Sequence, residues 1–131
     1  MGAFDMLAIA NTSLGMHQTW LDAIANNIAN VNTARPMSES AFQGQMVIAR
    51  ARPDATGVDV AGVALSDPNG RITYDPSNPL ADANGMVRMP DIDMASQMSQ
   101  LIMAQRGSQA SASVTKNAQD TYQAALQIGA R

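Results

Sequence analysis

The chain has 131 residues, a formal net charge of −3, one lysine, one histidine and no cysteine. Disulfides, thiol chemistry and a histidine cluster are therefore excluded, and nucleic acid or an anionic membrane surface is a poor partner because both need a basic surface. The length fits one ordinary domain, and the five aromatic residues predict a modest core of Leu, Ile, Val, Met and Ala.

The apolar runs are all too short to span a bilayer, and no basic region precedes the short apolar run at the N-terminus. We therefore expect neither direct membrane insertion nor a cleaved signal peptide. All six prolines lie between Pro36 and Pro90, so the two flanks are free of helix breakers. We divide the chain into an N-terminal helix (1–33), a middle segment with a loop and a small β element (34–90) and a C-terminal helix (91–131), together one structural unit.

The N-terminal flank has the a/d repeat of a coiled coil, with apolar residues at alternating steps of three and four. The positions are Leu7, Ala10, Leu14, His17, Leu21, Ile24, Ile28 and Val31. This spacing predicts one long helix with a single packing seam. His17 falls on that seam and has no ligand companion at helical spacing, so we interpret it as a packed histidine.

The stretch IANNIANVNT (residues 24–33) places four asparagines near the end of this helix, where their amides compete with the backbone. Asn26, Asn27 and Asn30 fall off the apolar seam. We interpret them as a docking face that hydrogen-bonds neighbouring helices, whereas Asn32 helps to end the helix. Substituting Asn27 or Asn30 with Ala is then expected to impair assembly more than the solubility of the monomer.

The middle segment contains short alternating runs typical of strands. GVDVAGVAL (residues 57–65) predicts a strand with a bulge at Gly62, and QMVIARAR (45–52) is a further candidate. RITYD and MVRM are short strand candidates on either side of a turn. Together they predict one small β element of two or three strands.

The C-terminal flank begins after Pro90, where Asp91 or Asp93 suits a helix N-cap. Further along, small residues recur at steps of three and four and predict close helix contact. They are Ala104, Gly107, Ser111, Val114, Ala118, Thr121, Ala125 and Ile128. The fold class predicted is mainly α, with the two terminal helices paired in a coiled-coil-like core and a short middle insertion rich in β-hairpins.

The outer faces of both predicted helices carry Gln, Asn, Ser and Thr in place of charges. Residues 94–128 contain only Arg106, Lys116 and Asp120 as charged groups. An amide or hydroxyl is desolvated at lower cost than an ion, so these faces suit protein contact better than water. The pattern predicts two helices that pair with each other and then pack into a larger assembly.

Enzymatic and metal chemistry finds little support in the residues. Asp91 and Asp93 are two positions apart, do not project from one helical face and have no third ligand. ADANG (residues 81–85) lacks the alternating carboxylates of a calcium loop and is better interpreted as a turn. We expect no catalytic site, no metal site and no cofactor.

Several motifs resemble a known family. ANNIANVNT (25–33) resembles the N-terminal signature of the bacterial flagellar rod and hook axial proteins, and YDPSNPLADANGMVRMPDIDMASQM (74–98) is most similar to their short proximal rod members. AQRGSQAS (104–111) and LQIG (126–129) match the family in part. Gly107 and Ser108 replace the usual Ser and Tyr.

The resemblance implies a structural subunit of the basal-body proximal rod. Such a subunit would assemble with copies of itself and other rod proteins into a helical tube that transmits torque and surrounds the export channel. It would leave the cytoplasm through the flagellar type III export apparatus. The interface residues we expect are Leu7, Leu14, Leu21, Ile24, Asn26, Asn27, Ile28 and Asn30, with Val114, Ala118, Tyr122, Ala125 and Ile128.

Two alternatives stay open at this point. One is a secreted helical-hairpin adaptor that forms a discrete complex with one partner. The other is a small hydrolase, which would need a perturbed acid or an activated nucleophile. A deletion that leaves motility intact would favour the adaptor over the rod subunit.

Overall fold

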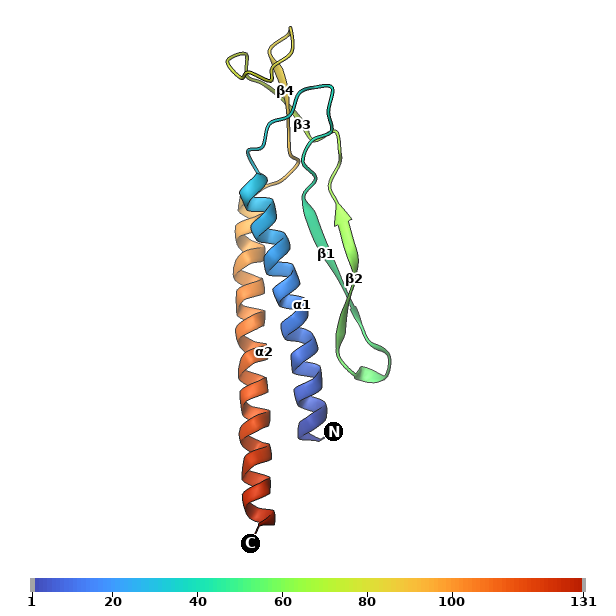
Figure 1. Cartoon of the computed structure of the whole chain (residues 1–131), viewed down its shortest axis with the longest axis vertical. Coiled ribbons are helices and arrows are strands. Elements are labelled where there is room, and N and C mark those ends of the chain that lie inside the picture. The colour runs from blue at the N-terminus through green and yellow to red at the C-terminus, as the bar shows by residue number, and fades with distance from the viewer. Residues whose placement is uncertain (1, 131) are drawn as a thin grey trace.

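The computed structural model describes residues 2–130, and two long helices dominate it (Figure 1). Helix α1 (Ala3–Asn30) has 28 residues and α2 (Met94–Gly129) has 36. The two lie side by side and run in opposite directions, and the C-terminal end of α2 extends past the first residue of α1 (Figure 1). The predicted pairing of the terminal helices is confirmed.

Each helix begins at a polar cap. The Asp5 carboxylate accepts a hydrogen bond from the Gly2 N–H at 3.0 Å, and the Asp93 carboxylate accepts one from the Ser96 N–H at 3.1 Å. Such caps satisfy N–H groups that have no partner within the helix. Of the two predicted caps for the second helix, Asp93 is therefore the one used, and Asp91 lies exposed before it.

A hairpin lies along α1 on the side away from α2 (Figure 1). Strand β1 (Gln45–Ala51) pairs with β2 (Val58–Leu65), and the short 3-10 helix η1 (Pro53–Ala55) lies at the tip. The register shifts between Ile48 and Ala49, which face Gly62 and Val60, so Ala61 is the extra residue of a bulge. Both predicted strands are confirmed, and the bulge predicted at Gly62 lies one residue earlier, at Ala61, because Gly62 itself is paired with Ile48.

A second, separate sheet lies beyond the ends of the helices (Figure 1). Strands β3 (Arg71–Tyr74) and β4 (Met86–Met89) form an antiparallel pair, so the expectation of one β element was wrong. The cause is the turn at Asp67–Gly70, where the Gly70 N–H donates to the Asp67 carbonyl and Gly70 has φ 59. This turn carries the chain away from β2 before β3 begins.

The segment after α1 is held against this second sheet by Arg88. The guanidinium donates to the carbonyls of Asn69 at 2.7 Å and Met37 at 3.0 Å, and Arg35 forms an isolated β-bridge to Arg88. The loop around residue 37, the turn at residue 69 and strand β4 are thereby fixed to one another. In the part of the chain described, the helices lack the combination of length and apolarity needed to cross a membrane.

Candidate assembly interface

The α1 side of the helix pair is packed as the heptad pattern predicts. All eight seam positions are buried or half-buried: Leu7, Ala10, Leu14, His17, Leu21, Ile24, Ile28 and Val31. On α2 the facing positions Ala104, Ser111 and Ala118 are buried. Their small side chains let the two backbones approach closely, so the seam is narrow and each contact buries little area.

The α2 stripe is buried only as far as α1 reaches. Ala104, Ser111 and Ala118, each one heptad apart, are buried against α1, whereas Val114 between them is 41% exposed. Ala125 and Ile128 follow where α2 extends past the first residue of α1, and both are exposed (Figure 1). The stripe therefore faces α1 up to Ala118 and is uncovered at its C-terminal end.

The only histidine packs directly on the backbone of the partner helix. The His17 ring donates from Nδ1 to the Ser13 carbonyl at 2.7 Å, and its other side lies so close to Gly107 that a Cβ there would overlap the ring. One turn further, the Ser13 and Ser111 hydroxyls are 2.8 Å apart and hydrogen-bonded. Gly107, which has no side chain, thus provides the space into which His17 fits.

Asn27 joins three elements of the fold. Its side chain is 2% exposed and pairs with both backbone groups of Gln45, donating to the carbonyl at 2.8 Å and accepting from the N–H at 2.7 Å. The same amide donates to the Gln97 side chain on α2 at 3.0 Å. The side chain thus replaces a neighbouring strand at the start of β1, so Asn27 finds its partners inside its own chain.

The other asparagines of the stretch make local contacts. The Asn30 amide donates to the Asn26 carbonyl at 2.9 Å and lies 3.2 Å from its side-chain oxygen, and the Thr33 hydroxyl donates to the Asn30 side chain at 3.2 Å. Both asparagines are half-buried. They close the last turn of α1 and leave part of each amide accessible.

The opposite end of the helix pair is open. Phe4 and Tyr122 meet edge to face with ring centroids 4.8 Å apart, yet they are 65% and 36% exposed. Beyond them α2 continues alone, and its apolar Leu126 and Ile128 are 55% and 76% exposed. Of the remaining expected interface residues, Ala125 is also exposed, whereas Leu14 and Leu21 are half-buried within the helix pair.

The chain exposes more surface than a compact protein of its size. It exposes 8245 Å², whereas a compact monomer of 13.8 kDa exposes about 6,600 Å². An apolar groove of about 310 Å³ runs between the two helices and is lined by Met6, Ile9, Ala10, Ser13, Ala110, Ser111 and Val114. The groove and the exposed end of α2 are two apolar surfaces of the helix pair that share no residue.

The Asp75 and Asp82 carboxylates accept hydrogen bonds within one loop. Within residues 2–130, no three His, Cys, Asp or Glu residues gather as a metal site would require. The Asn84 and Met86 N–H groups both donate to the Asp82 carboxylate at 2.9 Å, and Gly85 has φ 76, so ADANG is the predicted turn. In the same loop the Ser77 hydroxyl, with help from Asn78, lowers the pKa of Asp75.

Two hydrogen bonds that join elements of the chain could not be predicted from the sequence. Thr12, on the outer side of α1, accepts a hydrogen bond from the Val58 N–H at 3.0 Å, and Gln97 receives the Asn27 amide. Both are ordinary polar residues of a helix face. Their partners lie 46 and 70 residues away, beyond the reach of any local pattern.

Known proteins match the chain along nearly its whole length. A family model described as flagella basal body rod protein matches residues 14–36. The chain is 31% identical to the flagellar basal-body rod protein FlgC of Salmonella typhimurium, with 98% of this chain and 99% of the relative covered. FlgC of Borreliella burgdorferi is 28% identical with 98% of each chain covered, and FlgC of Bacillus subtilis is 24% identical with 98% and 99% covered. The similarity thus extends over both helices and the β region.

Proposed function

The chain belongs to the FlgC family of flagellar basal-body rod proteins and is a structural subunit of the rod; we propose that it builds the proximal rod through its two terminal helices. The observation that carries this assembly mode is the C-terminal end of the α2 stripe, where Ala125 and Ile128 are exposed beyond the reach of α1. Burying a side chain such as isoleucine contributes about 1.5–3 kcal/mol. Because Ile128 is 76% exposed, burying it against a neighbouring subunit would contribute most of that free energy.

The expected interface residues divide into three groups on this proposal. Ile24, Asn27 and Ala118 are buried inside the chain and give the subunit its shape. Tyr122, Ala125 and Ile128 are exposed and would contact neighbouring subunits directly. The half-buried residues hold the helix pair together and contribute their accessible edges to the interface: Leu7, Leu14, Leu21, Asn26, Ile28 and Asn30.

Torque transmission follows from such an arrangement. A contact between two different faces of neighbouring subunits repeats without closing and generates a helical tube. The outward apolar stripe and the groove between the helices are different faces of one subunit, so they suit this kind of contact. When each subunit contacts neighbours in several directions, no single interface bears the whole load. The tube also leaves room for an export channel.

The remaining parts of the proposal concern location and partners. We place the subunit in the periplasm-spanning part of the basal body, in contact with copies of itself and other rod proteins. It reaches that place through the flagellar type III export apparatus, and it acts without catalysis or cofactor. Segments 1–33, 34–90 and 91–131 work as one structural unit.

The direct test is deletion of the gene followed by isolation of basal bodies. We expect cells that lack flagella and a rod beyond the inner-membrane ring, with both restored by the wild-type chain, and we expect the chain in basal bodies from complemented cells. Mass spectrometry and electron microscopy of the isolated basal bodies measure this. Intact motility together with a stable one-to-one complex with another protein would instead support the adaptor.

A further inference from the structure

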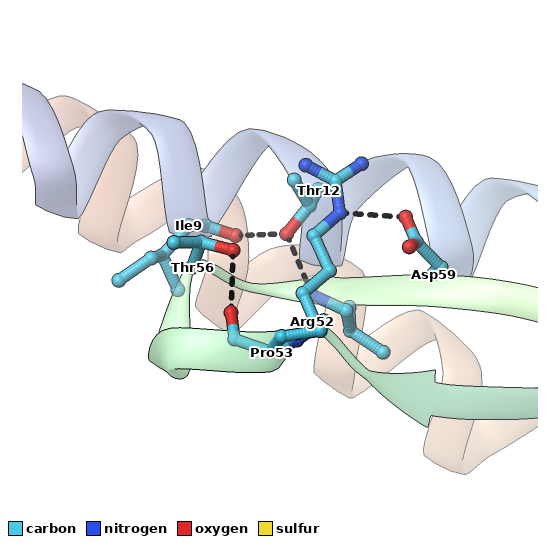
Figure 2. A network of polar contacts seen from close by, with 7 residues as sticks. Ile9, Thr12, Arg52, Pro53, Thr56 and Asp59 are labelled. Atoms are coloured by element: carbon cyan, nitrogen blue, oxygen red, sulfur yellow. Dashed lines mark hydrogen bonds and ion pairs between the residues drawn. The ribbon is translucent and has the colours of Figure 1, made fainter.

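The β1–β2 hairpin is fastened to α1 at two separate points. At its base, Asn27 holds the backbone of Gln45, and at its tip Thr12 receives the Val58 N–H (Figure 2). Thr12 and Asn27 lie 15 residues apart, which corresponds to about 22 Å along a helix. The hairpin is therefore a strap that follows α1 and is anchored near each end.

The base anchor is the stronger of the two. Asn27 makes three hydrogen bonds of 2.7–3.0 Å to Gln45 and Gln97 and is 2% exposed. Breaking it would leave buried polar groups without partners, which is costly because water cannot replace those bonds. The base is thus expected to stay closed for as long as the subunit is folded.

The tip anchor is a single hydrogen bond at a half-buried site. Thr12 accepts from Val58 at 3.0 Å while its own hydroxyl donates to the Ile9 carbonyl at 2.7 Å (Figure 2). The other polar contacts of the tip are internal: Arg52 Nε to the Asp59 carboxylate at 2.6 Å, and the Thr56 hydroxyl to the Pro53 carbonyl at 3.1 Å. The tip can therefore leave α1 with its own bonds intact.

Two further observations mark the tip as the weaker end. Asp54 and Ala55 have φ values of 61° and 56°, a left-handed conformation that is strained in residues other than glycine. A groove of about 390 Å³ separates the tip from the first turns of α1 and is lined by Asp5, Ala8, Ile9, Asp54, Ala55 and Thr56. The tip packs closely on α1 only at Thr12, where a Cβ added to Gly57 would overlap the hydroxyl, and one hydrogen bond accompanies this contact, whereas Asn27 alone gives the base three.

The bulge supplies a hinge between the two anchors. It lies opposite Ile48 and Ala49, and it divides the hairpin into a base half and a tip half. A Cβ at Gly62, beside the bulge, would meet no described atom within 4 Å, so the backbone has room to bend there. Bulges locally interrupt the ladder and bend the strand.

We propose that the tip half of the hairpin is a releasable strap, closed on α1 in the free subunit and swung away about the bulge when a neighbouring rod subunit packs against the N-terminal half of α1. This inference rests on the proposed function. Ile9 lines both the groove beneath the tip and the apolar groove between the helices, so release of the tip joins the two into one continuous surface. The neighbouring subunit then occupies the surface that the tip covered.

Amide hydrogen exchange on the purified chain tests the unequal anchors. We expect the Val58 amide to exchange at least about tenfold faster than the Gln45 amide, because the tip opens locally whereas the base opens only with the fold. Thr12→Val should accelerate exchange at Val58 and leave Gln45 unchanged. Equal protection of the two amides in the wild-type chain would overturn the proposal.

Cross-linking tests whether the hairpin tip is released on assembly. Because the chain has no native cysteine, only the introduced cysteines can react. Ala8→Cys with Thr56→Cys places two thiols on opposite walls of the groove beneath the tip. Leu65→Cys with Gln100→Cys is the matched control, because both residues line one groove of about 310 Å³ at the base. A short bifunctional thiol reagent is applied to each purified chain and to basal bodies isolated from cells that express it.

The expected result is efficient cross-linking of both pairs in the free chain, with loss of the tip cross-link and retention of the base cross-link in basal bodies. Equal tip cross-linking in both settings, or none in the free chain, would overturn the strap. Absence of the wild-type chain from basal bodies would contradict the proposed function instead. In that case the exchange rates still decide whether the tip opens independently of the base.

Discussion

The two ends of the helix pair differ in how completely the chain buries its own side chains. At the end near Asn27, α1, α2 and β1 converge, and Ile24 and Asn27 are 1% and 2% exposed. At the other end Phe4 and Ile128 are 65% and 76% exposed. One end of the subunit is therefore completed within the chain, whereas the other leaves an apolar surface uncovered.

The largest effect is expected at the closed end. Asn27→Ala removes three hydrogen bonds and leaves both backbone groups of Gln45 without their partner, so we expect a loss of about 2–4 kcal/mol in the free energy of unfolding. Urea denaturation of the purified chain measures it. Asn26→Ala is the control and should cost less than about 1 kcal/mol. Similar losses in the free energy of unfolding for the two variants would contradict the inference that Asn27 links α1 to β1 and α2.

A smaller loss is expected midway along the helices. Gly107→Val pushes a side chain into the His17 ring, and such overpacking costs about 1–3 kcal/mol. Thermal unfolding of the purified chain measures it, and adding His17→Ala should restore part of the stability. Gly15→Val is the matched control, because a Cβ there meets no described atom within 4 Å. The comparison fails if the variant at Gly15 is destabilised as strongly as the one at Gly107.

At the open end we expect almost no change in the stability of the free chain. Ile128→Ser alters an exposed side chain, so the free energy of unfolding should stay within about 0.5 kcal/mol of wild type. Incorporation into basal bodies should nevertheless fall, because the lost apolar contact belongs to the neighbouring subunit. Gln127→Ser is the control and should assemble normally. Normal rod yield and motility with Ile128→Ser would remove this residue from the interface.

The smallest effect is expected in the exposed loop at the far end of the second sheet. Hydrogen bonds from Ser77 and then Asn78 lower the pKa of Asp75 in the folded chain. The resulting contribution to stability is present above the ordinary pKa of aspartate and is lost as the pH falls through the lower, folded pKa. NMR titration should show the pKa of Asp75 rising in Ser77→Ala. An unchanged pKa would mean that the Ser77 hydroxyl does not stabilise the carboxylate.

The helices and strands could be predicted from the sequence because each is specified by local periodicity. The heptad from Leu7 to Val31, the cap before α2 and the bulge beside Gly62 all depend on neighbours within a few residues. The separation of the two sheets could not be predicted, since it depends on the turn at Gly70 and on Arg88 reaching carbonyls 19 and 51 residues away. Local patterns specify elements but leave their long-range contacts open.

The assembly face shows the same limit. The asparagine stretch was interpreted as a surface for neighbouring helices, yet Asn27 binds its own β1 and α2, so its substitution is expected to act first on the stability of the subunit. The alternating spacing of the α2 stripe includes the buried positions Ala104, Ser111 and Ala118. The exposure of its C-terminal end follows from the greater length of α2, which the spacing does not specify.

The unequal lengths of the helices have a mechanical consequence. Helix α2 has 36 residues and α1 has 28, a difference of eight that amounts to about 12 Å at 1.5 Å per residue. Subunits with such a projecting end do not stack with flush faces. Each layer of subunits would instead interlock with the next. The side chains of the projecting end of α2 would then resist sliding between layers under a twisting load.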